Sequence, residues 1–289
     1  MKLKDYKLKF VQTLLTIYDE MEVESFFYLI LEHFHQMKRI DLALNPSFKI
    51  SESEIGKWEE ILSDLKTEKP IQYILGETEF YGLKFKVNEN VLIPRQETEE
   101  LVELIVFESQ KAKLKSLKIL DIGTGSGCIA ISLAKNIPHA QVFALDVSEK
   151  AMEIAKENAE INEVEVHFIQ QNILEITNLT FDLGLSTFDI IVSNPPYVRM
   201  LEKEEIKPNV LEFEPHLALF VEDNDALLFY RKIAQLAKEN LSEDGKLYFE
   251  INQYLGKETV QLLEDLKFKN SKLIKDIYGN DRMTSCSVN

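Results

Sequence analysis

The stretch Ile119-Leu120-Asp121-Ile122-Gly123-Thr124-Gly125-Ser126-Gly127-Cys128 decides the fold of this chain. An apolar strand pattern ends in glycines on alternate positions, and a helical pattern of apolar residues begins at Cys128. Alternate glycines let the backbone turn tightly and come close to a ligand at the carboxyl end of the strand. The stretch therefore predicts the first strand–loop–helix unit of an α/β domain.

Strand and helix patterns alternate on the carboxyl side of this unit. We predict further strands and helices over residues 117–120, 128–135, 141–145, 150–161, 164–169, 188–192, 226–241 and 246–251. Such alternation is typical of a parallel sheet covered by helices on both faces. Residues 272–275 and 282–288 flank a Gly279-Asn280 turn and indicate a closing antiparallel pair.

The chain before the glycine-rich loop has a different pattern. Apolar residues recur at helical spacing from about Phe10 to Leu65, and Ser51-x-x-Glu54 is a capping box. Residues 78–87 alternate around a glycine and predict a short hairpin, and a helix is expected over residues 97–108. The sequence therefore predicts an N-terminal helical bundle joined to the α/β domain by a hairpin.

Composition excludes several classes of protein. The 289 residues are 45% hydrophobic and 28% charged, which is ordinary globular composition. The net charge is 33 − 49 = −16, whereas a protein that grips a phosphate backbone unaided usually has a basic domain. Two cysteines outside any metal-ligand spacing predict neither a disulfide framework nor a metal site. We find no secretory signal and no apolar run long enough for a membrane span, so we expect a cytoplasmic protein.

Polar residues after the predicted strands indicate a nucleoside cofactor. Gly125-x-Gly127-x-x-Ala130 satisfies the dinucleotide fingerprint, whereas Asp121-x-Gly123-x-Gly125-x-Gly127 is the loop of enzymes that bind S-adenosylmethionine. Asp146 ends the second strand, where a carboxylate can accept both ribose hydroxyls; a helix N-cap is the alternative. Asn172 could bind an adenine edge with Ile173 packed on the ring, and a turn-forming role is the other interpretation.

Asn194-Pro195-Pro196-Tyr197 distinguishes the two cofactors. The prolines fix φ and have no N–H, so the turn presents two acceptors, the Asn194 side-chain oxygen and the Pro195 carbonyl. Such a pair can receive both hydrogens of a planar –NH2 group, with Tyr197 stacked on the flat group. An enzyme that transfers hydride to or from a nicotinamide cofactor does not need two acceptors that bind an amino group. The turn therefore favours S-adenosylmethionine and methyl transfer to an amide or exocyclic amine.

These residues resemble a known family. Asn194-Pro195-Pro196-Tyr197 with the glycine loop is similar to the amino-group methyltransferases. Residues 70–76, 80–82 and 92–99 resemble the linker of the release factor glutamine methyltransferases, the HemK/PrmC family. Residues 214–220, 229–231 and 276–282 are also similar to that family, so the resemblance runs from about Pro70 to the C-terminus and is only architectural before it.

The resemblance implies a fold and a domain organisation. The fold is α/β, a Rossmann-like seven-stranded sheet that is mostly parallel with an antiparallel C-terminal hairpin, preceded by a helical bundle. Residues 1–72 would form the substrate-docking domain, residues 73–93 the hairpin linker and residues 94–289 the methyltransferase domain.

The resemblance also implies an activity and the residues that carry it. The family transfers methyl from S-adenosylmethionine, leaving S-adenosylhomocysteine, to the side-chain amide N5 of the glutamine in the Gly-Gly-Gln loop of peptide chain release factors. Asn194, Pro195 and Tyr197 would be catalytic, and the substrate amide would contact Asn194, Pro195, Pro196 and Tyr197. The residues that would bind the cofactor are Gly123, Thr124, Gly125, Ser126, Gly127, Asp146, Asn172, Ile173 and Asn194.

The expected partner is a release factor, with no direct nucleic acid, no membrane and a monomeric enzyme. Three alternatives stay open: a ribosomal protein glutamine methyltransferase, an adenine-N6 DNA methyltransferase and a cofactor-binding interaction module. Asn172 departs from the family, which often has Asp there, so the adenine contact would have to reorient. Residues 221–225 also depart, being acidic where the family tends to be glycine-rich.

Overall fold

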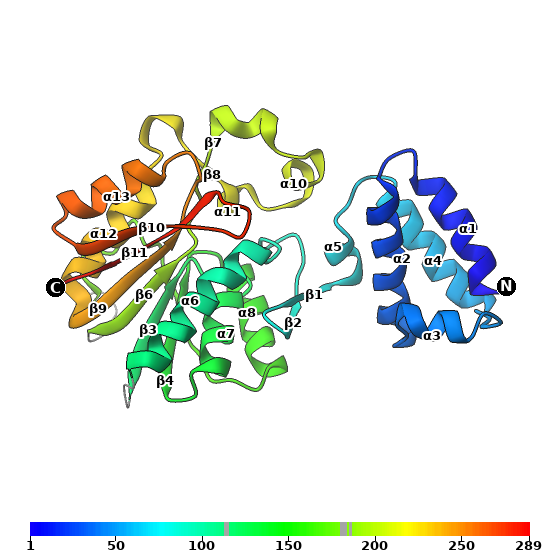
Figure 1. Cartoon of the computed structure of the whole chain (residues 1–289), viewed down its shortest axis with the longest axis horizontal. Coiled ribbons are helices and arrows are strands. Elements are labelled where there is room, and N and C mark those ends of the chain that lie inside the picture. The colour runs from blue at the N-terminus through cyan, green and yellow to red at the C-terminus, as the bar shows by residue number, and fades with distance from the viewer. Residues whose placement is uncertain (113–115, 180–183, 185–186) are drawn as a thin grey trace. The chain divides into compact units, whose positions relative to one another are not determined.

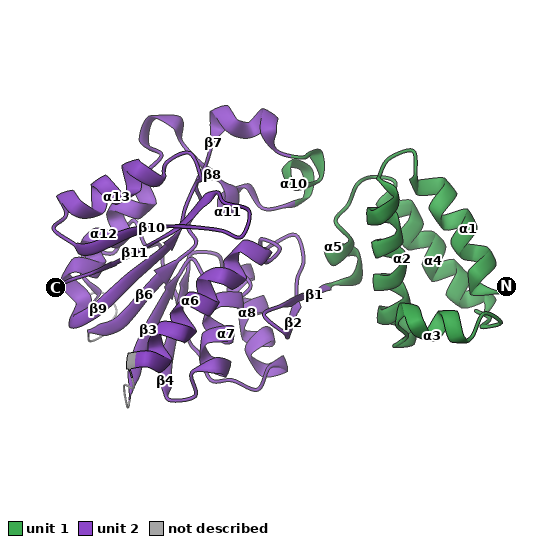
Figure 2. Cartoon of the chain, in the orientation of Figure 1, with its two compact units in different colours: residues 1–76, 207–213 green, residues 77–206, 214–289 purple. Residues whose placement is uncertain are grey.

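A computed structural model describes residues 1–112, 116–179, 184 and 187–289 of the chain. It has two compact units, coloured green and purple in Figure 2. The first comprises Met1–Gly76 with Lys207–Phe213, and the second comprises Glu77–Ile206 with Glu214–Asn289. We predicted that the first domain ends at residue 72. The first compact unit ends four residues later, at Gly76, and also includes Lys207–Phe213. Among the described residues, no helix is long and apolar enough to cross a membrane.

The first unit is helical. Its helices are α1 (Leu3–Leu14), α2 (Glu20–His35), α3 (Arg39–Leu44), α4 (Glu52–Leu65), α5 (Ile71–Leu75) and α10 (Pro208–Phe213). The predicted capping box is confirmed, because the Ser51 hydroxyl accepts from the Glu54 amide at 3.2 Å and the Glu54 carboxylate accepts from the Ser51 amide at 2.6 Å. Trp58 is fully buried and meets the rings of Tyr6 and Phe10 edge-on. The bundle therefore has a core of its own.

The second unit is built on one large sheet (Figure 1). Within the described residues its strand order is β10-β11-β9-β6-β3-β4-β5. The strands are β3 (Leu117–Ile122), β4 (Ala140–Asp146), β5 (His167–Gln170), β6 (Phe188–Ser193), β9 (Leu241–Glu250), β10 (Lys269–Lys275) and β11 (Asp281–Ser287). Neighbouring strands are parallel from β9 to β5, whereas β11 runs antiparallel to both β9 and β10. This confirms the predicted seven-stranded, mostly parallel sheet with an antiparallel C-terminal hairpin.

Helices cover the sheet on both faces. They are α6 (Gln96–Ala112), α7 (Cys128–Asn136), α8 (Glu149–Ile161), α12 (Leu228–Asn240) and α13 (Gly256–Asp265). The short helix α11 (His216–Leu219) lies between α10 and α12 along the chain. Successive residues of β3 point to opposite sides, so Ile119 joins the cluster that contains α6 and α7, while Leu120 joins the cluster that contains α12 and α13. Burial on both sides explains why these strands are continuously apolar.

Small elements complete the second unit. The predicted hairpin consists of β1 (Glu77–Phe80) and β2 (Leu83–Lys86), and β7 (Val198–Arg199) pairs in parallel with β8 (Phe220–Val221). Two 3-10 helices, η1 (Met200–Glu205) and η2 (Asp223–Asp225), lie in the segments around this pair.

Three strands begin more than one residue away from their predicted start, and one of them is β10, which begins at Lys269 where we expected residue 272. We expected a strand from residue 164, but β5 begins at His167 because Glu163 is left-handed and the Val164 amide donates to the Ala159 carbonyl, which ends α8. We expected another strand from residue 246, whereas β9 begins at Leu241 and contains a register shift against β6 between Phe188 and Ile190.

Candidate active site

The carboxyl ends of five adjacent strands carry the polar residues of the candidate site. Ile122 of β3 pairs with Leu145 of β4 on one side and with Ser193 of β6 on the other. Asp146 of β4 pairs with Gln170 of β5, and Ser193 pairs with Phe249 of β9. In the order β5-β4-β3-β6-β9, the residues at or just after the strand ends are Asn172, Asp146, the glycine loop, Asn194 and Glu250. The structure thus brings the sequence-predicted residues to one edge of the sheet.

The glycine loop has the backbone that its sequence predicts. Gly123, Gly125 and Gly127 have φ of +75°, +55° and +82°, a region that favours glycine. The Gly123 and Thr124 amides donate to the Leu145 carbonyl at 2.7 and 3.1 Å, which fastens the loop to β4. At Gly127, whose φ is +82°, a Cβ would lie 2.8 Å from Ile131 Cδ1 and 3.2 Å from Ala155 Cβ, so glycine is favoured where the loop enters α7.

Asp146 is joined to this loop. Its Oδ2 accepts from the Gly125 amide at 2.8 Å, and its Oδ1 accepts from the Ser148 amide at 2.9 Å. Burial raises the pKa of the Asp146 carboxyl, and the backbone amides of Ser148 and Gly125 oppose that rise. The N-cap of α8 is Ser148, whose hydroxyl accepts from the Ala151 amide. The N-cap alternative for Asp146 is therefore wrong, and its carboxylate lies at the loop.

Asp121 lies beneath the loop and is fully buried. Its Oδ2 accepts from the Thr124 hydroxyl at 2.6 Å. Burial raises the pKa of Asp121 to about 7, although the Thr124 hydroxyl favours the charged form. A titratable group with a pKa near neutrality thus supports the second residue of the loop.

Asn172 makes turn contacts. Its Oδ1 accepts from the Leu174 amide at 3.0 Å, and its Nδ2 donates to Glu175 Oε1 at 3.1 Å. Ile173 is buried and belongs to the same core cluster as Leu145. Asn172 therefore does what the turn-forming alternative predicted, and a contact with adenine would require its side chain to exchange one of these partners.

The acceptor turn follows β6 and is held at both ends. Asn194 Nδ2 donates to the Thr98 hydroxyl at 3.4 Å, and the Tyr197 hydroxyl donates to Glu250 Oε1 at 3.1 Å. The Tyr197 carbonyl accepts from Asn252 Nδ2 at 2.9 Å. In the described part of the chain, no group donates to Asn194 Oδ1 or to the Pro195 carbonyl. Pro195 is buried, and Pro196 is half-buried between these two held residues.

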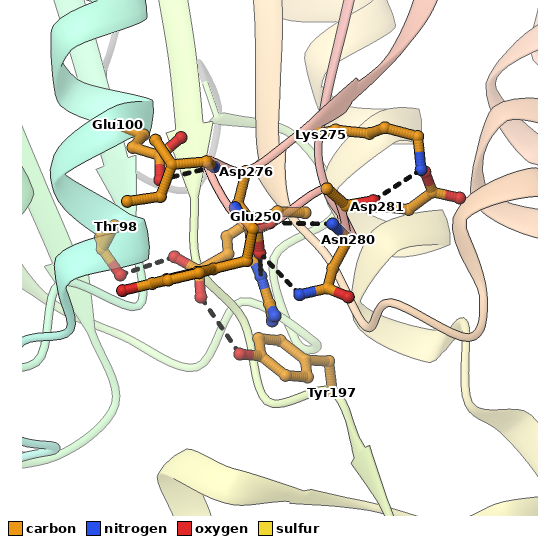
Figure 3. A network of polar contacts seen from close by, with 12 residues as sticks. Thr98, Glu100, Tyr197, Glu250, Lys275, Asp276, Asn280 and Asp281 are labelled. Atoms are coloured by element: carbon orange, nitrogen blue, oxygen red, sulfur yellow. Dashed lines mark hydrogen bonds and ion pairs between the residues drawn. The ribbon is translucent and has the colours of Figure 1, made fainter.

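Sequence analysis did not identify Thr98, Glu250 or Asn158 as site residues. Thr98 donates its hydroxyl hydrogen to Glu250 Oε2 at 2.6 Å, as Figure 3 shows. Asn158 of α8 donates to the Ser126 carbonyl in the glycine loop at 2.9 Å and to the Lys86 carbonyl of β2 at 3.0 Å. An acidic residue at the end of an otherwise apolar strand was a usable signal for Glu250. Thr98 and Asn158 carry no such local signal, because their partners are distant in the sequence.

The sequence of this chain is similar to those of known proteins. Residues 99–212 match the methyltransferase small domain, and residues 10–76 match the PrmC N-terminal domain. The release factor glutamine methyltransferase of Flavobacterium psychrophilum is 66% identical over 98% of this chain and 98% of its own length. That of Bacteroides thetaiotaomicron is 45% identical over 96% of each chain.

A solved structure agrees at the level of the fold. A methyltransferase from Pyrococcus furiosus superimposes with a TM-score of 0.50 at 20% identity, covering 73% of this chain and 91% of that one. This likeness shows the shared fold alone. With the two family matches and the identity to curated relatives over nearly the whole length, this chain belongs to the release factor glutamine methyltransferase family.

Proposed function

We propose that this protein transfers the methyl group of S-adenosylmethionine to the side-chain amide N5 of the glutamine in the Gly-Gly-Gln loop of peptide chain release factors. One observation carries the proposal: the acceptor turn follows the strand beside the glycine loop, with the amide nitrogen of Asn194 already engaged and its oxygen without a donor in the described structure. A glutamine amide offers the two N–H donors that this oxygen and the Pro195 carbonyl lack.

The residues at the sheet edge fit the cofactor. No heavy atom lies within 4 Å of a Cβ built on Gly123 or Gly125, so the backbone surface of the loop is open to a ligand. We assign the methionyl end to residues 123–127 and the ribose hydroxyls to Asp146. The adenine ring would lie against Ile173 and Asn172. Asn194 directly follows β6, the strand beside β3, and we place the meeting of the donor methyl and the substrate nitrogen there.

The acceptor turn accounts for the chemistry. The lone pair of an amide nitrogen is delocalised into its carbonyl, so the nitrogen is a weak nucleophile. Asn194 Oδ1 and the Pro195 carbonyl would each accept one of its N–H groups and favour the pyramidal, positively charged nitrogen that forms during attack. When bound, the cofactor supplies a sulfonium methyl, and alignment of the nitrogen about 3 to 3.5 Å from it provides much of the remaining rate. The methylated nitrogen is at first positively charged and strongly acidic, so it loses one proton to water without a side-chain base and leaves the neutral methyl amide.

We assign the helical unit to the protein substrate. Residues 1–72 would dock the release factor, residues 73–93 would link the domains and residues 94–289 would carry the reaction. A net charge of −16 supports a protein partner with basic patches over direct contact with nucleic acid. We propose that the enzyme acts as a monomer in the cytoplasm and does not bind membranes.

Transfer of label from the cofactor tests the proposal. The protein is incubated with a release factor, its loop variant in which the glutamine is alanine, a ribosomal protein and duplex DNA. We expect label only on the unaltered release factor. Label on the alanine variant would contradict the assigned nitrogen, and label on DNA or on the ribosomal protein would favour one of the alternative activities.

A further inference from the structure

One buried carboxylate is linked by hydrogen bonds to both ends of the acceptor turn, to one directly and to the other through Thr98. Glu250 is 1% exposed and ends β9, the strand beside β6. Its Oε2 accepts from the Thr98 hydroxyl at 2.6 Å, and its Oε1 accepts from the Tyr197 hydroxyl at 3.1 Å (Figure 3). Thr98 in turn contacts Asn194, so the first residue of the turn reaches Glu250 through Thr98 and the last residue reaches it directly.

The number of hydrogens in this chain of contacts determines which way the Asn194 amide faces. A threonine hydroxyl has one hydrogen and two lone pairs. Because a carboxylate can only accept, the short contact to Glu250 uses the only hydrogen of Thr98. Thr98 Oγ1 can then offer Asn194 nothing but a lone pair, which suits Nδ2 and repels Oδ1. The other end of the amide, Oδ1, must face away from Thr98.

Hydrogen bonds and one cation oppose the effect of burial on Glu250. Burial raises the pKa of the Glu250 carboxyl above its ordinary value, and the hydroxyls of Thr98 and Tyr197 and the Arg282 guanidinium limit that rise. Both hydroxyls point their hydrogens at the carboxyl oxygens, which is the arrangement that an acceptor-only carboxylate requires. Arg282 is itself held by Asp276, which accepts from Arg282 Nε at 3.3 Å. Burial together with Glu250 raises the pKa of Tyr197, so the phenol keeps its hydrogen and stays a donor.

We propose that Glu250 and Thr98 are positioning residues that orient the Asn194 amide so that its oxygen, and not its nitrogen, faces the substrate amide. This inference rests on the proposed function, since it names what aims the acceptor in that reaction. Neither residue touches the substrate. A wrongly turned Asn194 would present N–H groups to the N–H groups of the glutamine and would repel them. The orientation therefore affects the rate of transfer more than the binding of the protein substrate.

Matched threonine variants test the role of Thr98. Thr98→Val removes the hydroxyl at nearly constant shape, and we expect kcat for release factor methylation to fall about tenfold, the scale of one hydrogen bond. KM for the release factor and the affinity for S-adenosylmethionine should stay close to those of the unaltered enzyme. Thr98→Ser restores the hydroxyl and should recover most of the rate. Thr259→Val is the control, because Thr259 is equally buried but donates to the Leu255 carbonyl of its own helix.

A double-variant cycle separates orientation from general support. If Thr98 acts through Asn194, Thr98→Val should cause little further loss in single-turnover rate once Asn194→Ala is present. Multiplied losses would overturn the inference, as would a Thr98→Val enzyme with unaltered kcat or one that Thr98→Ser does not rescue. Glu250→Gln tests the positioning role without altering Thr98. The glutamine N–H groups can donate to Thr98 Oγ1, which then no longer donates its own hydrogen to residue 250. We expect a larger loss of kcat than for Thr98→Val, because Tyr197 also loses a carboxylate partner.

The unaltered enzyme distinguishes the two possible failures. If it does not methylate the release factor, the proposed function is wrong, and the positioning role that rests on it is overturned with it. If it does methylate the release factor while Thr98→Val and Glu250→Gln both match its kcat, the function stands and the positioning role is wrong.

Discussion

Replacement of Asn194 should lower the rate of methyl transfer without a matching loss of cofactor binding. Its oxygen is proposed to strengthen its contact with the substrate nitrogen as positive charge develops there. Asn194→Ala should therefore lower the methylation rate by at least ~10²-fold, the scale for one transition-state hydrogen-bond partner. Cofactor binding, measured by calorimetry, should be largely retained because the glycine loop and Asp146 are unaltered.

A matched asparagine provides the control for Asn194. Asn136 donates to the Ser132 carbonyl within α7, so Asn136→Ala removes an amide that does not reach the site. Single-turnover rates with labelled cofactor compare the two variants. Equal rates for Asn194→Ala and the unaltered enzyme would refute the acceptor role.

Asp121 predicts a pH dependence of stability. Burial raises its pKa from about 3.9 when unfolded to about 7 in the fold. Because the folded pKa is raised, the contribution of Asp121 to stability is fully present below the unfolded pKa and is lost as the pH rises through about 7. Asp121→Asn does not titrate and can still accept from the Thr124 hydroxyl.

Urea denaturation of the cofactor-free protein measures this effect. As the pH rises from about 5 to about 8, the unaltered protein should lose unfolding free energy that Asp121→Asn does not lose. The unfolding free energy of the variant should therefore increase relative to that of the unaltered protein. Each unit of raised pKa corresponds to about 1.4 kcal/mol, so a difference of a few kcal/mol is the upper bound. A difference between the two proteins that does not change with pH would show that Asp121 is not the titrating group.

At the scale of elements, α8 joins the hairpin to the glycine loop through one side chain. Asn158 Nδ2 donates to the Lys86 and Ser126 carbonyls, and Asn158 Oδ1 accepts from the Lys86 amide at 2.6 Å. Asn158 is fully buried, so Asn158→Ala leaves backbone groups without these partners away from water. We expect the variant to lose about 3 kcal/mol of unfolding free energy. Its affinity for S-adenosylmethionine should also fall, because the loop loses a support at Ser126.

Asn240 is the control for Asn158. It is 3% exposed and donates to the Leu236 carbonyl of its own helix, α12, at 2.8 Å. Asn240→Ala thus removes a buried amide without touching the loop or the hairpin. Urea denaturation gives the unfolding free energy of both variants, and titration with S-adenosylmethionine gives their cofactor affinity. A loss of cofactor affinity that is equal in the two would argue against a specific role for α8 at the loop.

The elements show which features were predictable from sequence. Apolar strand patterns and the glycine loop depend on local periodicity and backbone conformation, so β3, β4 and β6 begin and end close to where we predicted them. The Thr98–Glu250 contact joins residues 152 positions apart. Such a contact depends on the order of strands in the sheet, which periodicity does not encode. The early start of β9 at Leu241 was missed for a related reason, since its pairing with β6 passes through a register shift.

At the scale of the whole molecule, each unit has its own apolar core. The core around Trp58 contains residues of α1, α2 and α4. Its last members along the sequence are Ile71, Ile74 and Leu75 of α5. Gly76 follows α5 with φ of +73° and serves as its C-cap, which ends the helical unit before β1 begins. The structural boundary is therefore a helix terminus, and a cut after Gly76 preserves both cores better than a cut at residue 72.

Removal of the first 76 residues should uncouple docking from catalysis. The shortened chain, residues 77–289, keeps the glycine loop, Asp146 and the acceptor turn, so it should bind S-adenosylmethionine as the full chain does. It should also methylate a short Gly-Gly-Gln peptide with an unaltered kcat/KM, because we assign that segment to the acceptor turn, which the truncation leaves intact. For the intact release factor we expect kcat/KM to fall at least about tenfold, equivalent to ~1.4 kcal/mol of lost docking free energy. The peptide is the internal control, since misfolding would lower both values together. Equal retention of both activities would place the docking surface within residues 77–289 and contradict the role proposed for the helical unit.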